Sequence, residues 1–364
     1  MADKSGSRTS LTSQKNSRTR GKASSGVTLE DVALKAGVST ASVSRLMKDT
    51  NAVSAKLRLK IETAINELGW MPHAAARALA TNRTRTIGAI FPTLANEHFS
   101  TATQVLQEQL ERYDYTLLLA CSEYDLKREL RQVRKMLERG VDAMVLVGDR
   151  HEQELYPLLR TRAVPFVSTF TWRAGNDPLC IGADNQRAFY DATRYLISLG
   201  HTRFGMLAQR AEHNDRALAR RTGVRLALEE ESLAIRPSHF VEGYWGVEEG
   251  RKLFHKLINV SPRPTAVICG NGTFAMGALL EALSMGIKVP EELTIFGFDD
   301  FELMKELPVA ISTIRIPSEE IGCKATHYLM EALGEENQAI NWNTEAECRA
   351  ELILRDSSGK PYVG

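Results

Sequence analysis

The sequence predicts a small all-α head of three helices, followed by an α/β body of two doubly wound parallel-sheet lobes. Two observations predict this fold class. Residues 28–69 contain three short stretches with apolar residues at helical spacing. From Thr86 onward, short apolar runs alternate with longer amphipathic stretches, which is the pattern of βαβ units. A chain of 364 residues is long enough for two or three domains.

The head follows a basic, Ser-rich tail, residues 1–27, that we expect to be disordered. Thr28, Ser39 and Ser54 each precede a helical stretch and are candidate N-caps. Gly37 lies between the first two helices, where a tight turn requires a positive φ. Three helices in so short a segment make a very small core, which is typical of a helix-turn-helix module.

The second helix of such a module enters the major groove of DNA, and residues at its N-terminus reach the base edges. Thr40 and Ala41 can contact a thymine methyl group, and Arg45 can reach guanine or a phosphate. Ser39 and Ser42 can donate or accept hydrogen bonds there. A generic three-helix bundle is the alternative, and the Gly37 turn and the small polar residues beside it weigh against it.

Charge is divided unevenly along the chain, although the net charge is only +1. Residues 1–85 contain 15 Lys+Arg and 6 Asp+Glu, a net charge of +9, and the remainder contains 31 and 39, a net charge of −8. A basic end on an acidic body favours nucleic-acid binding by that end. Lys48, Lys56 and Arg58 are candidates for phosphate contacts, although a solvated surface charge explains any one of them more simply.

Residues 70–85 read as a linker between the head and the body. Pro72 ends the third helix, and the Ala-rich stretch 73–80 has a high helix propensity but only one large apolar side chain, Leu79. The stretch is too short to be a stable helix alone, so we expect it to fold only when it docks against a partner. Leu79 can be a wedge between DNA base steps, but its residue type alone favours packing against the adjacent lobe.

The body is predicted from alternating strands and helices. The predicted strands are 87–91, 115–120, 141–147, 164–167, 204–207, 239–242, 266–269 and 293–297. The predicted helices are 97–112, 126–139, 151–162, 216–230, 247–258 and 273–285. Doubly wound sheets bind ligands at the carboxyl ends of their strands, so the expected ligand site is the cleft between the two lobes.

Composition excludes several classes of protein. Apolar residues make up 43% of the chain and charged residues 25%, which is ordinary for a protein that buries a core and atypical of disorder. No stretch approaches 18 consecutive apolar residues, so we expect no membrane segment. The five cysteines lie far apart, and the first 27 residues lack the apolar core of a secretory signal. We therefore expect a cytoplasmic protein with reduced thiols, no metal site and no cofactor.

The chain resembles the lac/galactose repressor family of bacterial transcription regulators from Thr28 to about Ser357. The resemblance is carried by Thr28-Leu29-Glu30-Asp31-Val32-Ala33, Ala36-Gly37-Val38-Ser39, Val43-Ser44-Arg45, Ala76-Arg77-Ala78-Leu79, Gly200-His201, Gly297-Phe298-Asp299-Asp300 and Ser312-Thr313-Ile314. It implies a periplasmic-binding-protein-like body and a homodimer that binds double-stranded operator DNA of near-palindromic sequence. Two hinge helices would form only on specific DNA, with Leu79 of each subunit in the minor groove.

The resemblance and the helix-turn-helix geometry together give two sets of candidate site residues. The predicted DNA-contacting residues are Thr28, Ser39, Thr40, Ala41, Ser42, Arg45, Lys48, His73, Arg77 and Leu79. Lys48 and His73 stand where the family usually has Asn. The predicted effector-binding residues are His98, Phe170, Arg220, Trp245, Asn271 and Asp299.

The chemistry of the second set suits a small polyhydroxyl ligand. Arg220 is a forked donor, Asp299 accepts from paired hydroxyls, Asn271 donates and accepts, and Trp245 offers a flat face for a ring. Phe170 and Gly272 stand where sugar-binding members often have an acid. Their presence favours a sugar acid, a phosphorylated compound or a less polar ring over a neutral hexose.

The resemblance also suggests boundaries within the chain. We expect a tail at 1–27, a DNA-binding head at 28–69, a hinge at 70–85 and an effector-binding body at 86–357. The first lobe would contain about 86–184 and 317–340, and the second about 185–312 and 345–357. Because no heptad pattern follows Arg355, we expect a dimer rather than a tetramer held by a terminal coiled coil.

Three functions remain open at this point. The first is a ligand-controlled DNA-binding repressor, in which the effector shifts the populations of two lobe arrangements. The second is a solute-binding protein of a transport system, and the third is a regulator controlled by a protein that docks on the body. No dinucleotide fingerprint, P-loop or metal-ligand cluster is present, so an enzyme is the remote alternative. Whether the effector releases the operator or promotes its binding stays open.

Overall fold

A computed structural model describes residues 27–48, 52–71, 78, 81, 83–173, 175, 179–336 and 340–362. The chain divides into two units, residues 1–82 and residues 83–364, and each is described by itself. His73, Arg77 and Leu79, which we predict to contact DNA, lie outside the described residues, as does the side chain of Lys48.

The first unit contains the three predicted helices, α1 (Leu29–Ala36), α2 (Thr40–Lys48) and α3 (Ala55–Leu68). Gly37 ends α1 with a φ of 67°, as the tight turn into α2 requires. The three helices share a small apolar core that includes Val32, Val43, Leu46 and Ile61. This core fixes the orientation of α2, so residues on its other side are held at the surface.

Two of the three predicted N-caps are confirmed. Thr28 and Asp31 form a reciprocal capping box at α1, and the Ser39 hydroxyl accepts a hydrogen bond from the Ser42 backbone N at 3.2 Å. The prediction for Ser54 is wrong in one respect. Its backbone is extended as at an N-cap, but its side chain makes no capping hydrogen bond. Ser54 is exposed, so water can serve both its hydroxyl and the first N–H groups of α3.

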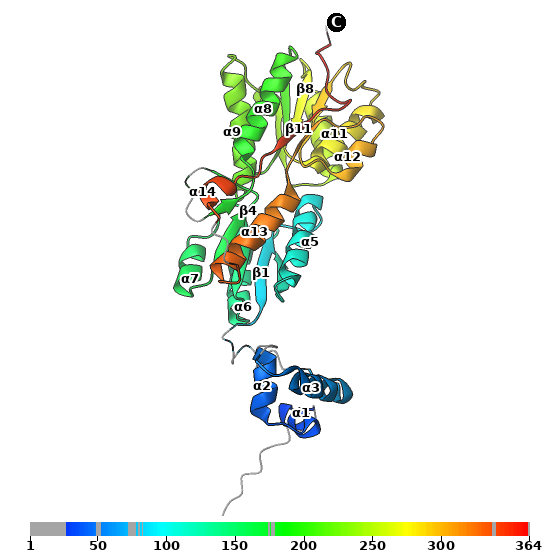
Figure 1. Cartoon of the computed structure of the whole chain (residues 1–364). Coiled ribbons are helices and arrows are strands. Elements are labelled where there is room, and N and C mark those ends of the chain that lie inside the picture. The colour runs from blue at the N-terminus through cyan, green and yellow to red at the C-terminus, as the bar shows by residue number, and fades with distance from the viewer. Residues whose placement is uncertain are drawn as a thin grey trace, which may run out of the picture. The chain divides into compact units, whose positions relative to one another are not determined.

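The first lobe of the second unit is built on a five-stranded parallel sheet (Figure 1). Its strands are β1 (Thr86–Phe91), β2 (Thr116–Cys121), β3 (Ala143–Val147), β4 (Phe166–Thr169) and β5 (Cys180–Ile181), in the order β2-β1-β3-β4-β5. One face packs against α5 (Glu97–Glu111) and α13 (Ser318–Ala332), and the other against α6 (Leu126–Glu138) and α7 (Leu155–Thr161). Helices on both faces leave the strand ends as the place for a ligand.

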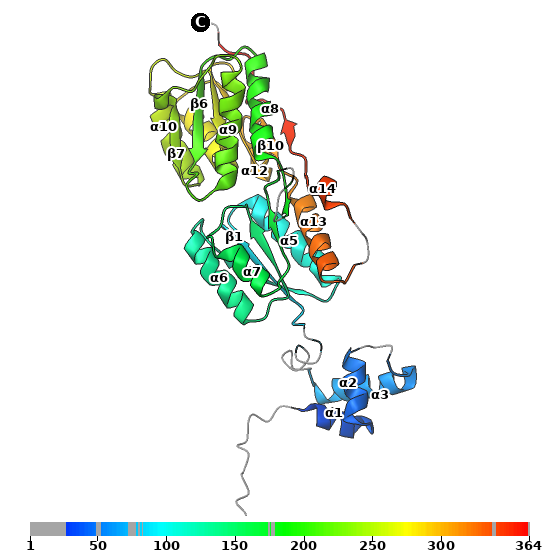
Figure 2. The ribbon, with the colours of Figure 1, turned by 90° about the vertical axis from the view of Figure 1, so that its left-hand side faces the viewer.

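The second lobe repeats this plan with four parallel strands (Figure 2). They are β6 (Phe204–Gln209), β7 (Phe240–Gly243), β8 (Ala266–Cys269) and β9 (Thr294–Phe296), in the order β7-β6-β8-β9. The paired helices α8 (Asn185–Ser198) and α9 (Asp215–Glu229) cover one face, and α10 (Val247–Ile258) and α11 (Gly272–Ser284) cover the other. Smaller elements are η1 (Pro237–His239) and α12 (Glu302–Glu306).

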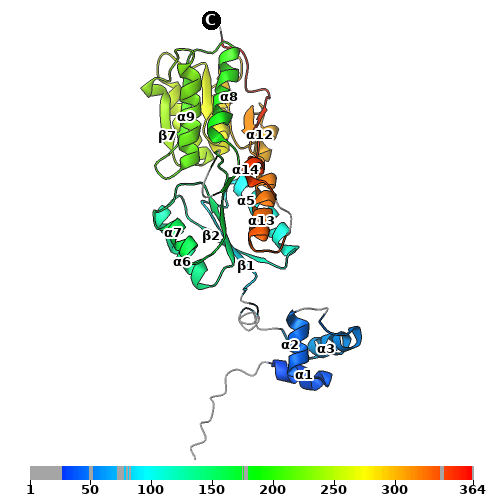
Figure 3. The same ribbon diagram turned by 60° about the vertical axis from the view of Figure 1, so that its left-hand side comes forward.

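The chain passes between the two lobes more than once. It leaves β5 for α8, returns after β10 (Thr313–Arg315) to α13, and crosses again from α14 (Trp342–Glu345) to β11 (Glu351–Ile353), which pairs antiparallel with β10 (Figure 3). The helices α8 and α13 are not among those that we predict from the alternating pattern. Both lie beside these crossings, where the strand–helix alternation is interrupted.

Within the described residues, no helix is long and apolar enough to cross a membrane. The thiols of Cys121, Cys269, Cys323 and Cys348 are free, and the same part of the chain contains no group of three or more His, Cys, Asp or Glu side chains that could hold a metal ion.

The contact between α8 and α9 depends on a glycine. A Cβ atom added to Gly223 would lie 2.1 Å from the backbone oxygen of Gln186. We expect Gly223→Ala to lower the free energy of unfolding by about 1–3 kcal/mol, because the added methyl group must push the two helices apart. Urea denaturation followed by circular dichroism measures this change.

Thr222→Ala is the matched control, because Thr222 precedes Gly223 on the same helix and is not buried. Its stability should stay within about 0.5 kcal/mol of the parent. Where a helix has room, Ala is more favourable than Gly by up to about 1 kcal/mol. A Gly223→Ala variant as stable as the parent would therefore contradict the close approach of α8 and α9.

Candidate functional site

The predicted base-reading residues form an exposed face of α2. Ser39, Thr40, Ala41 and Arg45 are exposed, and the Ser42 side chain is half-buried beside Ser39, with 3.0 Å between their hydroxyl oxygens. The Arg45 Nε donates to the Ala41 backbone oxygen at 3.3 Å, which holds the guanidinium along the helix. The sequence prediction therefore places donors, acceptors and a methyl group on one accessible surface.

Two basic residues of the head are already paired. Arg58, a candidate phosphate contact, donates to Glu62 at 2.8 Å, and Lys35 pairs with Glu67 at 2.9 Å. Exposed pairs of this kind contribute little to stability, so DNA phosphates can displace the carboxylates. Lys56 is exposed on the first turn of α3.

A pocket of about 510 Å³ lies between the two lobes of the second unit. It is lined from the first lobe by Pro92, Thr93, Glu123 and Tyr124, and from the second by Gln209, Arg210, Glu212, His213, Asn214, Tyr244 and Trp245. These residues lie at or after the carboxyl ends of β1, β2, β6 and β7. The pocket therefore lies where parallel sheets bind ligands. Of the predicted effector residues, Trp245 lines it, with 43% of its surface exposed.

His98 and Asp299 meet across the lobe boundary. The His98 Nδ1 lies 2.7 Å from the Asp299 Oδ1, and both side chains are buried. Asp299 has a φ of 84°, and its second carboxylate oxygen accepts a hydrogen bond from the Gly272 backbone N at 3.1 Å. Burial alone would raise the pKa of Asp299, but the facing His98 ring and the Arg220 guanidinium hold it below its usual value.

Arg220 is a buried cation held by the second lobe itself. Its Nε donates to the Asn185 side chain at 3.1 Å, its Nη1 donates to the Gly270 backbone oxygen, and its guanidinium lies 4.2 Å from the centre of the Phe298 ring. Burial lowers the pKa of Arg220 to about 10, so it remains charged at neutral pH. The guanidinium therefore gives the interior of the second lobe a fixed positive charge that acts on Asp299.

Phe170 contributes an apolar ring to this interior. Its backbone has a φ of 64°, its side chain is buried, and its ring stacks on His98 with 5.0 Å between ring centres. The aromatic ring fills volume and forms no hydrogen bond. The local chemistry around His98 is accordingly apolar on one side and charged on the other.

Asn271 carries a donor that no other described residue satisfies. Its Oδ1 caps α11 by accepting from the Phe274 backbone N at 2.8 Å and from the Thr273 hydroxyl. Its Nδ2 is buried and has no hydrogen-bond partner within the described part of the chain. A buried amide without a partner is costly, so Nδ2 is a natural donor to a ligand oxygen.

Tyr124 is a cleft residue that the sequence reasoning missed. It follows β2, has a φ of 60°, and bonds through its hydroxyl to Gln209 of the second lobe. Burial raises the pKa of its phenol. Its position just after the carboxyl end of a strand is the signal that could have identified it. Tyr244 is a mostly exposed cleft residue that was missed in the same way. The Arg210 guanidinium lies over its ring, 4.4 Å from the ring centre.

A further cross-lobe contact joins Gly148 and Asp149 to the start of α9. The Asp149 backbone N donates to the Asp215 carboxylate at 3.2 Å. A Cβ atom on Gly148, which has a φ of 85°, would lie 1.9 Å from an Arg216 nitrogen. Burial and the charge of Asp215 raise the pKa of Asp149. For Asp215 the effect of burial is outweighed by Arg216 and by the Asp149 N–H, so its pKa is lowered.

Comparison with family models finds two matches in this chain. Residues 28–73 match bacterial regulatory proteins of the lacI family, and residues 193–358 match a periplasmic binding protein-like domain. The two segments contain, respectively, the three helices of the head and most of the second lobe.

Similar proteins of known type are transcription regulators. The chain is 30% identical over 342 residues to the HTH-type transcriptional repressor PurR of Serratia proteamaculans. This match covers 92% of this chain and 98% of that protein. It is 29% identical to catabolite control protein A of Priestia megaterium, over 85% of this chain and 93% of that protein.

Solved structures agree with this similarity. A lacI-family transcriptional regulator from Silicibacter pomeroyi matches with a TM-score of 0.80 and 25% identity, over 91% of this chain and 99% of that one. The lac repressor dimer bound to operator and the anti-inducer ONPF shares the fold, with a TM-score of 0.79 and 22% identity, over 92% of this chain and 100% of that one.

The lowered pKa of Asp299 predicts a pH dependence of stability. The charged carboxylate stabilises the folded state above the ordinary pKa of 3.8, and this contribution is lost as the pH falls through the lower folded-state value. We expect Asp299→Asn to be less stable than the parent at pH 6, and the difference to shrink below pH about 4.

Urea denaturation between pH 2.5 and 7 measures this difference. Asp191→Asn is the control, because Asp191 forms only an exposed ion pair with Arg187 on α8. A stability difference for Asp299→Asn that stayed constant across this range would contradict the role of its charge.

Proposed function

Because the chain belongs to the lacI family of bacterial regulatory proteins, we propose that it is a sequence-specific DNA-binding repressor that binds a near-palindromic operator as a homodimer. A small effector in the cleft between the lobes controls it. In this proposal residues 28–69 bind DNA, residues 70–85 form the hinge, and residues 86–357 bind the effector and dimerise. Its relatives are transcription regulators rather than enzymes.

The observation that carries the DNA-binding part is the exposed face of α2. The apolar residues Val43 and Leu46 anchor the helix in the head, while Thr40, Ala41 and Arg45 stay accessible. A helix with this division can lie in the major groove and present its first turns to base edges. Arg45 is proposed to contact guanine or a phosphate, and Thr40 and Ala41 a thymine methyl group.

Leu79 is proposed as the second DNA-reading element. By resemblance to the family, one Leu79 per subunit would lie in the minor groove, where an apolar wedge kinks the duplex. The Ala-rich stretch around it has the composition of a helix that needs a partner to be stable. Formation of the hinge would then be coupled to recognition of the correct operator.

The effector is proposed to be a small sugar-like molecule or sugar acid. Trp245, Tyr244 and Tyr124 supply flat apolar surfaces at the pocket, which suit the faces of a ring. Asn271 supplies a donor that has no partner in the described part of the chain, and Arg220 and Arg210 supply positive charge. The replacement of an acid by Phe170 favours a ligand that carries its own negative charge.

Control of the operator is proposed to follow from a change in the lobe arrangement. His98 with Asp299, and Asp149 with Asp215, are contacts that exist only when the lobes approach each other. A ligand that binds one arrangement more tightly shifts the population toward it. The two heads of the dimer would then be at, or away from, the half-site spacing of the operator.

Capture of DNA tests the proposed function directly. The purified full-length protein is mixed with sheared DNA of its source organism at near-physiological salt, and the bound fragments are sequenced. We expect enrichment of a short inverted repeat, with or without added metabolite extract. Arg45→Ala should reduce discrimination between this repeat and random DNA by about 1–3 kcal/mol.

Arg58→Ala is the matched control, because it removes a charge near DNA without removing a base contact. It should weaken binding to the repeat and to random DNA alike. Absence of any enriched repeat, even with metabolite extract, would contradict a sequence-specific repressor.

The hinge proposal makes a separate prediction. Leu79→Ala should lose most specific binding while non-specific binding, which depends on phosphate contacts and salt, stays nearly unchanged. Fluorescence anisotropy with the captured operator and with a scrambled duplex of equal length measures both. Equal weakening on the two duplexes would show that Leu79 is not a wedge.

A further inference from the structure

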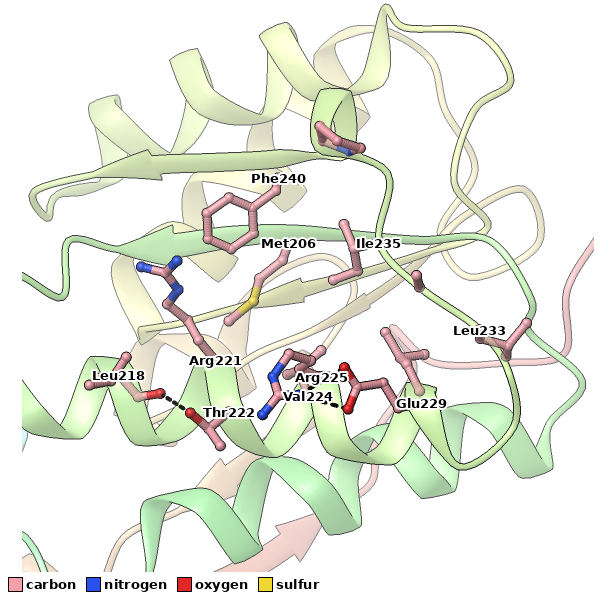
Figure 4. Close-up of a pocket in the computed structure, with 13 residues that line it drawn as sticks. Met206, Leu218, Arg221, Thr222, Val224, Arg225, Glu229, Leu233, Ile235 and Phe240 are labelled. Atoms are coloured by element: carbon pink, nitrogen blue, oxygen red, sulfur yellow. Dashed lines mark hydrogen bonds and ion pairs between the residues drawn. The ribbon is translucent and has the colours of Figure 1, made fainter.

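A second cavity, of about 570 Å³, lies in the second lobe between α9, the edge strand β7 and residues 233–237 (Figure 4). It shares no lining residue with the interlobe pocket. Its volume falls in the range of sites for small molecules. Nothing in the proposed control mechanism uses it.

The cavity has an apolar floor. Met206 from β6 and Val224 and Leu228 from α9 are almost fully buried beneath it, and Ile235 and Phe240 border it. In Figure 4 the Phe240 ring and the Met206 thioether extend from their strands toward α9. A ligand with an apolar body would remove this surface from water, which favours binding.

The polar side of the cavity is formed by two arginines, Arg221 and Arg225, and by the carboxylate of Glu229. Arg221 lies 4.7 Å from the centre of the Phe240 ring and donates from Nη1 to Glu242 at 2.7 Å. Arg225, one turn further on, donates from Nη1 to both carboxylate oxygens of Glu229. In the described part of the chain, neither arginine donates a hydrogen bond from its Nε or its Nη2.

These open donors fit one chemical group. The Nε–H and Nη2–H of a guanidinium point in parallel and hold a carboxylate with two hydrogen bonds. The existing ion pairs occupy the other nitrogen and are exposed, so they do not compete strongly. An apolar floor beside two forked cations is complementary to an amphipathic anion.

We propose that this cavity is a second ligand site of the protein, which binds a small carboxylate with an aryl or alkyl body. The body lies on Met206, Val224 and Phe240, and the carboxylate pairs with Arg221 and Arg225. The site is separate from the interlobe cleft, although both involve α9. Arg220 of this helix points to the lobe interior near Asp299, and Arg221 lines the cavity.

Methyl NMR of the full-length protein tests the proposal, with methionine labelled at its methyl carbon. Met206 lies in the floor and is assigned by Met206→Leu. The probe is 4-phenylbutyrate, and 4-phenylbutan-1-ol is its neutral analogue. We expect saturable shifts of the Met206 signal with the acid, and at least about tenfold weaker binding of the alcohol, because it cannot form the paired hydrogen bonds.

Variants locate the site. Arg221→Gln and Arg225→Gln should each weaken binding of the acid several-fold, and Ala234→Trp, which fills the exposed mouth without changing a charge, should abolish it. Arg187→Gln is the matched control, because Arg187 also pairs with a carboxylate four residues on and stacks on a tyrosine, but lies on α8 outside the cavity. Asp299→Asn tests independence from the cleft, and should leave binding unchanged.

Three results would overturn the proposal. The first is a Met206 signal that does not shift at millimolar 4-phenylbutyrate. The second is binding of 4-phenylbutan-1-ol with the same affinity as the acid. The third is a loss of acid binding in Arg187→Gln as large as that in Arg221→Gln. None of these results bears on operator binding, so the second site can fail while the proposed repressor function stands.

Discussion

A buried carboxylate lies where the two lobes meet, and the arrangement of the body depends on its neutralisation. Asp299 is placed there by a left-handed backbone turn after β9, and it faces His98 from the opposite lobe at 2.7 Å. Removing a carboxylate from water is costly unless opposite charge and hydrogen bonds replace the water. Arg220 and the N-terminus of α11 provide part of this replacement from within the second lobe, and His98 adds its part only when the lobes are together.

This constraint gives the lobe boundary two distinct energetic states. With the lobes together, His98 pairs with Asp299, and with the lobes apart, water must take the place of His98. A ligand that offers hydroxyl groups to Asp299 and an acceptor to Asn271 competes in the same place as His98. The cleft is therefore a place where a modest binding energy can change the balance between the two arrangements.

The helix α9 connects several of these features. Its first turn forms the Asp215 contact with the other lobe, its middle carries Arg220 into the interior, and its outer face carries Arg221 and Arg225. Gly223 lets it lie directly against α8, so the helix is held on that side by backbone contact. A rigid element with functional groups on opposite faces is well suited to keep them in fixed register.

Local sequence was sufficient for much of the fold and for part of the site. Apolar spacing and capping residues specified the three helices of the head, because these signals act within one helical turn. The alternation of strands and helices identified the parallel sheets for the same reason. Trp245, Asn271 and Asp299 follow strand ends or begin a helix, and the family resemblance named them, together with Arg220 in the middle of α9, as effector-binding residues.

Tertiary structure decided which of these side chains already have a hydrogen-bond or ion-pair partner within the described part of the chain and which do not. No local pattern relates His98 to Asp299, which are 201 positions apart, or brings Tyr124 to Gln209. The cavity at Met206 likewise depends on how far α9 and β7 stand apart. The sequence by itself determined the periodic elements and the chemistry at their ends, because these depend on neighbouring residues. The pairing of charges and the shape of cavities depend on distant residues, so only the folded chain decided them.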